Sequence, residues 1–184
     1  MQHKLIQRIN ALSEAFKAQN QFDIKRIAND SISEAVLYND FEMAKVSIIA
    51  YCLYKMLTKE HFISNPKWKN VSNSISNNLN KSAFALTKNQ KRAFKKHLKE
   101  TIEKIEEIDQ NLSHYAKAMY EKAKIKQAST AYALGLSLSQ AATLTGANKK
   151  ELQKYIGITR IHDEEPYKES IAERLSVLRN IIGK

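Results

Sequence analysis

The densest run of side chains that could bind an anion is KNQKRAFKKHLK, residues 88–99. It carries six basic residues and no acidic one: Lys88, Lys91, Arg92, Lys95, Lys96 and Lys99. On a helix these side chains would cover a broad face opposite Phe94 and Leu98, and such a face can neutralise nucleic-acid phosphates. The same pattern also fits a basic face that is merely solvated. The acidic turn that begins at Glu103 limits the face on its C-terminal side.

Two other short segments combine residue types that can bind ligands. NPKWKN, residues 65–70, places Trp68 between two lysines, as in proteins that stack single-stranded nucleic acid. A single tryptophan on a helical stripe is more typical of a core, and we expect it there. IHDEEPYKES, residues 161–170, places His162 directly before Asp163, Glu164 and Glu165, but consecutive residues of an extended chain do not converge on one metal ion. We interpret it as a connector whose acids precede the N-terminus of a last helix.

The chain contains no pattern typical of an enzyme. It has no Ser/His/Asp arrangement, glycine-rich phosphate loop or pair of carboxylates at catalytic spacing, and its histidines are scattered. The single cysteine, Cys52, lies in the apolar run KVSIIAYCLYKML, which favours core packing and rules out an internal disulfide framework or a Cys-based zinc site. We therefore expect a non-catalytic protein with no cofactor and no metal.

The composition points to an anionic partner. The net charge of the 184 residues is +11 and the pI is about 9.6, so the protein should attract DNA, RNA or an acidic protein. The N-terminal MQHKLIQRIN lacks the apolar region of a signal peptide. The most apolar stretch, residues 46–53, is too short to span a bilayer. We expect a soluble cytoplasmic protein with no membrane partner.

The elements that must position these residues are predicted to be helices. Apolar residues recur with a period of 3.6 almost throughout, and the chain has only four glycines and two prolines, so we predict an all-α fold. Helices are expected over residues 2–19, 22–38 and 41–57. Asp40 should cap the third of these, which is apolar on nearly every side and should be the central helix of the bundle.

The second half of the chain continues the pattern. Pro66 should end any preceding helix at Asn65, and helical spacing resumes after it. A long helix is expected from Lys88. The first helices weakly resemble tetratricopeptide hairpins, but the aromatic and glycine positions of that repeat are missing, which favours a plain bundle. We place a boundary near residues 110–112, between a helical bundle for association or partner binding (1–110) and a C-terminal part (111–184). A last helix over about 167–182 would pack on the bundle or form the seam of a homodimer.

Residues 137–157, SLSQAATLTGANKKELQKYIG, predict two short helices joined by a sharp turn. Gly135 is well placed to end the preceding helix in the left-handed conformation. Ser137 and Gln140 have the spacing of a capping box at the start of the first short helix. Gly146 ends that helix, because glycine permits the positive φ of the turn.

The second short helix should begin at a capping Asn148 and end at Gly157. Its inward residues are Leu152, Tyr155 and Ile156. Ala142 lies four residues before Gly146, where two steeply crossing helices leave little room for a side chain.

The segment SLSQAATLTGANKKELQKYI resembles the DNA-binding helix-turn-helix family, and also the helix-turn-helix of small archaeal proteins and antitoxins. The resemblance covers residues 131–160 and is carried by six residues: Ala142, Gly146, Ala147, Asn148, Leu152 and Tyr155. Thr145 departs from the family pattern, in which an apolar residue usually precedes the glycine. The resemblance implies that the second helix lies in the major groove of duplex DNA.

The resemblance also implies which side chains would contact DNA. The outward residues of the second helix are Lys149, Lys150, Gln153 and Lys154. Lysine can reach guanine acceptors or phosphates, and glutamine can pair with adenine. Ser139 and Gln140 at the start of the first helix, together with Arg160, would add phosphate contacts. We therefore expect a DNA-binding transcription regulator or chromosome-associated factor. The alternative is a helical adaptor whose basic faces bind an acidic protein or RNA, including the ribosome.

Overall fold

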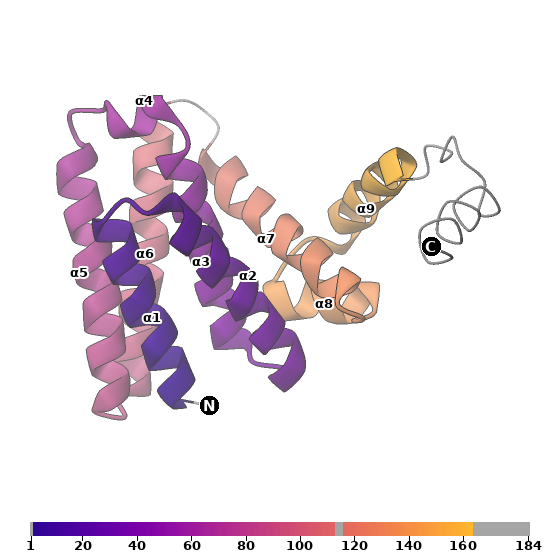
Figure 1. The fold of residues 1–184 in the computed structure, drawn as a ribbon, viewed down its shortest axis with the longest axis horizontal. Coiled ribbons are helices and arrows are strands. Elements are labelled where there is room, and N and C mark those ends of the chain that lie inside the picture. Colours follow the sequence, from indigo (N-terminus) through magenta and orange to yellow (C-terminus); the bar gives the residue numbers. More distant parts are fainter. Residues whose placement is uncertain (1, 113–115, 164–184) are drawn as a thin grey trace, which may run out of the picture.

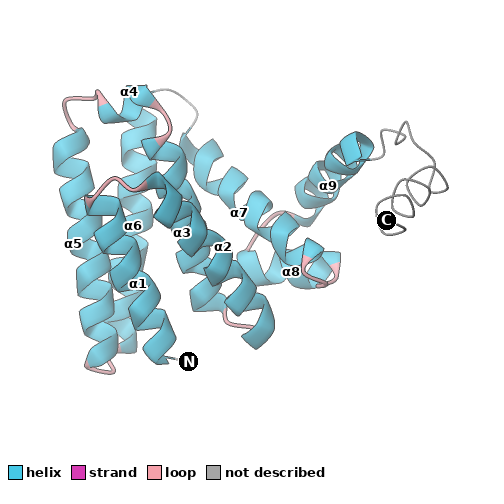
Figure 2. Ribbon diagram, in the orientation of Figure 1, coloured by secondary structure: helices cyan, strands magenta, loops and turns pink. Residues whose placement is uncertain are grey.

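The computed structural model describes residues 2–112 and 116–163, and every regular element in these two ranges is an α-helix (Figures 1 and 2). The all-α prediction is confirmed. The helices are α1 (Gln2–Lys17), α2 (Gln21–Tyr38), α3 (Phe41–Leu57), α4 (Glu60–Ile63), α5 (Trp68–Thr87), α6 (Lys91–Leu112), α7 (Ala116–Ala133), α8 (Leu138–Thr145) and α9 (Lys149–Asp163). The predicted acidic connector beyond Asp163 and the last helix over about 167–182 lie outside the described residues.

Helix α3 is the central element of the fold, as its all-round apolar character predicts. It packs against α1, α2, α4, α6, α7 and α8. Most of its side chains are buried, and Cys52 is among those with no exposed surface. Its first turn begins where the sequence indicates, because an Asp40 carboxylate oxygen accepts hydrogen bonds from the backbone N–H groups of Glu42 and Met43 at 2.9 and 3.0 Å.

Three helices end in a left-handed residue that is not glycine. Gln19, Asn39 and Asn89 have φ of 52°, 50° and 56°, and they follow α1, α2 and α5. In the last case the N–H of Gln90 donates to the carbonyl of Ala85 at 2.8 Å, which closes the end of α5. The prediction of a long helix from Lys88 is therefore wrong at its start. Lys88 belongs to the end of α5, and α6 begins at Lys91.

One buried apolar cluster runs through the described chain, from Leu5 in α1 to Leu152 in α9. Trp68 belongs to it and packs edge-on against Phe16, with ring centroids 6.0 Å apart, which confirms the core interpretation of NPKWKN. The boundary near residues 110–112 stays a prediction, although α7, beyond it, packs directly on α3 and α6. Among the described helices, none is long and apolar enough to cross a membrane.

Candidate nucleic-acid interface

Helices α7, α8 and α9 pack on one another and place α9 on the side of the molecule away from α1 and α5 (Figure 1). The end of α7 has the predicted form. Gly135 has φ of 104°, and the N–H of Leu136 donates to the carbonyl of Ala131 at 3.3 Å. Helix α8 then begins with the predicted capping box. The Ser137 hydroxyl accepts from the Gln140 N–H at 3.2 Å, and the Gln140 side-chain oxygen accepts from the Ser137 N–H at 2.9 Å.

The turn between α8 and α9 also follows the sequence prediction. Gly146 has φ of 68°, and the next N–H, of Ala147, donates to the carbonyl of Ala142 at 3.1 Å. The Asn148 side-chain oxygen accepts from the N–H groups of Lys150 and Glu151 at 2.9 and 3.2 Å, which caps α9. A Cβ atom at Gly146 would meet nothing within 4 Å, so the backbone conformation explains this glycine and a close approach does not.

Thr145 is the residue that departs from the helix-turn-helix pattern, and the structure explains how a polar group is tolerated there. The residue is buried, and its hydroxyl donates to the carbonyl of Ala141, one turn earlier, at 2.8 Å. The hydrogen-bonding capacity of the hydroxyl is thus used within α8, and the methyl group remains for packing. Threonine at this position therefore does not disturb the turn.

The prediction that Gly157 ends the second helix is wrong. Helix α9 continues through Gly157 to Asp163, and the glycine is an ordinary helical residue with open space around it. Glycine is enriched just after helix ends but does not by itself terminate a helix, because right-handed φ is also open to it. The predicted inward face holds, since Leu152 is fully buried and Tyr155 and Ile156 are half-buried.

The predicted DNA-contacting residues of α9 lie together on its outer side, which we call the α9 face: Lys149, Lys150, Gln153 and Lys154. All four are exposed, and no described acidic side chain lies within ion-pair distance of the three lysines. Arg160 lies further along the same helix, and its side chain is outside the described part of the structure. The α9 face is thus a cationic surface on a helix fixed by a buried leucine.

Ser139 and Gln140 are exposed at the start of α8, but they do not share a face with the lysines of α9. They line a groove of about 510 Å³. Asn39, which follows α2, and Phe41, which begins α3, line the same groove from the opposite side. A phosphate bound at the N-terminus of α8 would therefore also meet the corner between α2 and α3.

The basic residues of the segment 88–99 are all exposed, but three of them have acidic partners. Lys96 and Lys99 pair with Glu100 and Glu103, one turn along α6, at 3.9 and 3.3 Å. Lys95 pairs with Glu42 of α3 at 3.6 Å. The remaining members are Lys91, Arg92 and Lys88, whose ammonium group lies 5.6 Å from the ring centre of Phe84. The segment contains no acid, yet the fold partly neutralises its charge.

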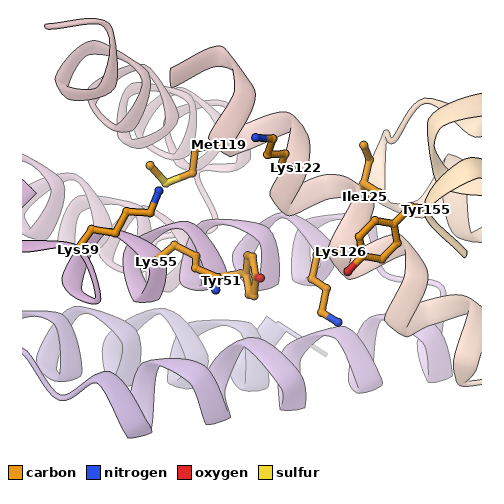
Figure 3. Close-up of a pocket in the computed structure, with 8 residues that line it drawn as sticks. All are labelled: Tyr51, Lys55, Lys59, Met119, Lys122, Ile125, Lys126 and Tyr155. Atoms are coloured by element: carbon orange, nitrogen blue, oxygen red, sulfur yellow. The ribbon is translucent and has the colours of Figure 1, made fainter. Parts of the chain in front are cut away.

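The structure also contains a cationic groove that was not predicted from the sequence. It is a groove of about 410 Å³ between α3, α7 and α9, which we call the α3–α7 groove (Figure 3). Eight residues line it: Tyr51 and Lys55 of α3, Lys59 just before α4, Met119, Lys122, Ile125 and Lys126 of α7, and Tyr155 of α9. The one sequence signal is a shared spacing: Lys55 and Lys59 lie four residues apart, as do Lys122 and Lys126. Within α7 this spacing places both lysines on one helix face.

Tyr51 forms the middle of the α3–α7 groove, with Lys55 on one side and Tyr155 on the other (Figure 3). Burial raises the pKa of Tyr51 to about 12, so its hydroxyl stays neutral at physiological pH. The Lys55 ammonium group lies 5.6 Å from the centre of its ring, a cation–π contact that keeps this charge at the groove.

A metal site has no support among the described residues. No three side chains of His, Cys, Asp or Glu come together there in a way that could hold a metal ion. No known protein family, curated protein or solved structure matches this chain. The geometry of the α9 face and of the α3–α7 groove is therefore the basis for inferring what the protein binds.

Proposed function

We propose that helices α8 and α9 form a helix-turn-helix that binds duplex DNA, with the α9 face in the major groove. The proposal is that of a transcription regulator or chromosome-associated factor without catalytic activity. It rests on the resemblance of residues 131–160 to helix-turn-helix proteins and on the cap and turn geometry of Ser137, Gly146 and Asn148.

The observation that carries the proposal is the state of the α9 face. Its three lysines and Gln153 point away from buried Leu152, on a helix held by an N-cap at one end. The lysines have no described acidic partner, whereas half of the cationic residues of segment 88–99 do. A lysine displaces the counterions of a DNA phosphate most favourably where no protein carboxylate already balances the lysine's charge, which makes α9 the better DNA surface.

Gly157 adds a second argument. It lies three residues after Lys154 and four after Gln153, so it shares their side of the helix. Glycine costs a helix about 1 kcal/mol relative to alanine, and nothing near Gly157 would obstruct a Cβ atom. Folding alone therefore gives no reason for this glycine. A glycine on the DNA side of α9 allows the helix backbone to approach the groove wall closely.

The proposal is tested by the salt dependence of duplex binding. Fluorescence anisotropy of a labelled duplex should show micromolar or tighter binding at about 50 mM salt. If four to six lysines or arginines contact phosphates, a plot of log K against log salt should have a slope of roughly −4 to −5. A salt-independent affinity, or no binding at low salt, would refute the DNA-binding proposal. Competition with unrelated duplexes separates a sequence-specific regulator from a general chromosome-associated factor.

One observation favours the adaptor alternative. At the corner between α2 and α3, Leu37 is 71% exposed and both Tyr38 and Phe41 are 43% exposed, a gathering of large apolar side chains typical of protein contacts. An adaptor would form a complex that survives nuclease treatment and is lost on Leu37→Asp. A DNA-binding protein would lose its co-purifying partners after nuclease treatment and keep duplex binding in the Leu37→Asp variant.

A further inference from the structure

The α3–α7 groove has the construction of a ligand site that is separate from the α9 face. Its volume of about 410 Å³ falls in the range of roughly 300–1,000 Å³ that is common for small-molecule sites. Its walls include apolar or aromatic groups of three helices: Tyr51, Met119, Ile125 and Tyr155. All four are half-buried, so they offer both packing surface and access from solvent.

The charges around the groove define the class of ligand. Four lysines line it, and none of its eight lining residues is acidic. Figure 3 shows Lys59 and Met119 near one end of the groove, and Lys126 and Tyr155 near the other. A cation therefore lies close to an apolar group at both ends. Duplex DNA would use such lysines for phosphate contacts, but it would leave the half-buried apolar walls between them unused.

We propose that the α3–α7 groove binds a small amphiphilic anion, that is, an apolar ring or chain that carries a carboxylate, sulfonate or phosphate group. The apolar body packs against Tyr51 and Met119, and the anionic group contacts the lysines at the rim.

The position of the groove relative to α9 separates it from the proposed DNA surface. Tyr155 contributes to the groove from the inward side of α9, whereas Lys150 and Lys154 lie on the exposed side of the same helix. A ligand in the groove and a duplex on the α9 face would therefore contact opposite sides of one helix. The ligand site does not depend on the proposed DNA binding, and the two can be tested separately.

The test uses two dyes with the same aromatic body. Anilinonaphthalene sulfonate is an amphiphilic anion whose fluorescence rises in apolar surroundings, and N-phenylnaphthylamine lacks the sulfonate. We expect saturable binding of the sulfonate to the full chain, about tenfold tighter than that of the neutral dye. Equal affinity for the two dyes, or no saturable binding, would overturn the proposal.

Matched variants locate the charge requirement. Lys59→Gln with Lys126→Gln removes one exposed lysine from each wall of the groove, and Lys96→Gln with Lys99→Gln removes the same charge from α6. The first pair should weaken binding of the sulfonate dye about tenfold, and the second should change it less than about twofold. Equal weakening by both pairs would mean that net charge alone attracts the dye, and it would overturn the proposal.

A second readout identifies the place of binding independently of affinity. The chain has four methionines, and of these Met119 lines the groove while Met43 and Met56 are buried in the core. In methyl NMR spectra, assigned with Met119→Leu, the sulfonate dye should shift the Met119 signal and leave those of Met43 and Met56 in place. An unmoved Met119 signal during saturable binding would place the dye elsewhere. Displacement of the dye by a short DNA duplex would show that the groove belongs to a nucleic-acid surface, and it would also overturn the proposal.

Discussion

Replacing Gly146 and Gly157 by alanine, one at a time, should change the stability of the protein in opposite directions. Gly146 has φ of 68°, a conformation that costs an L-residue about 1–2 kcal/mol. Alanine also lowers the conformational entropy of the unfolded chain, which stabilises the folded state by about 0.4–1 kcal/mol and offsets part of this cost. The added Cβ atom meets nothing within 4 Å, so no clash contributes. The net loss for Gly146→Ala should be about 1 kcal/mol.

Gly157 lies inside α9 with an ordinary helical φ and equally open surroundings. Alanine is better than glycine in a helix interior by about 1 kcal/mol, so Gly157→Ala should stabilise the protein by up to that amount. The two variants should therefore differ by about 2 kcal/mol. For a chain of this length the difference corresponds to roughly 4–8 °C in Tm.

The assay is thermal and urea unfolding of the parent and both variants, followed by far-UV circular dichroism. Gly146→Asn serves as a control, because Asn39 and Asn89 already hold the left-handed conformation in this chain, and it should cost less than Gly146→Ala. A Gly146→Ala protein as stable as the parent would refute the strained-turn argument. A destabilised Gly157→Ala protein would mean that α9 does not continue through residue 157.

Three further perturbations test the parts of the fold around these helices. Ser137→Ala removes the hydrogen bond from the Gln140 N–H to the Ser137 hydroxyl, which caps α8, and should cost about 1 kcal/mol in urea unfolding; an unchanged midpoint would contradict the capping geometry. Gln19→Gly relieves a φ of 52° and should stabilise the chain by about 0.5–1 kcal/mol, whereas a loss of stability would show that the turn is unstrained. Burial raises the pKa of Tyr51 from about 10 to about 12, so its stabilising contribution is complete below pH about 10 and is lost as the pH rises toward 12. Tyr51→Phe should therefore remove one late-ionising tyrosine from the ultraviolet titration and reduce the loss of stability between those pH values.

The sequence predicts this fold well because most of its signals are local. Apolar spacing determines helices, and Asp40, Ser137 and Asn148 mark helix starts through hydrogen bonds to residues two or three positions away. Gly146 marks a turn because few other residues adopt its φ. Each of these predictions depends on neighbours in the chain, and each is confirmed.

The failed predictions have equally local causes. The sequence predicts a helix end at Gly157, but a glycine permits a left-handed turn without requiring one. The sequence predicts a helix from Lys88, but Asn89 adopts the left-handed conformation, which asparagine tolerates, and α6 begins only at Lys91. In both cases the local sequence permits either outcome, a helix that continues or a left-handed residue that ends it.

The charge of the surfaces could be derived from the sequence only in part. Lys96 and Lys99 pair with acids one turn along α6, a spacing that the sequence shows, but other contacts join different helices. Lys95 has no acidic neighbour within its own segment, but α3 places the Glu42 carboxylate 3.6 Å from its ammonium group. The α3–α7 groove unites lysines more than sixty positions apart in the chain, Lys55 and Lys122 among them. Neither result is visible in a single segment. Together they make α9 and the groove better candidates for binding an anion than segment 88–99.

The central claim, that the α9 face binds duplex DNA, is tested most directly by two lysine triples of equal charge. One replaces Lys149, Lys150 and Lys154 with alanine; the other replaces Lys95, Lys96 and Lys99, which already pair with carboxylates. Anisotropy with a labelled duplex at about 50 mM salt should show that the α9 triple weakens binding about a hundredfold or more, at roughly 1 kcal/mol per lost contact. The salt slope should fall by about 3, while the α6 triple changes the affinity by less than about fivefold. Equal losses in the two triples, or an α9 triple that binds as the parent does, would contradict the proposed role of α9.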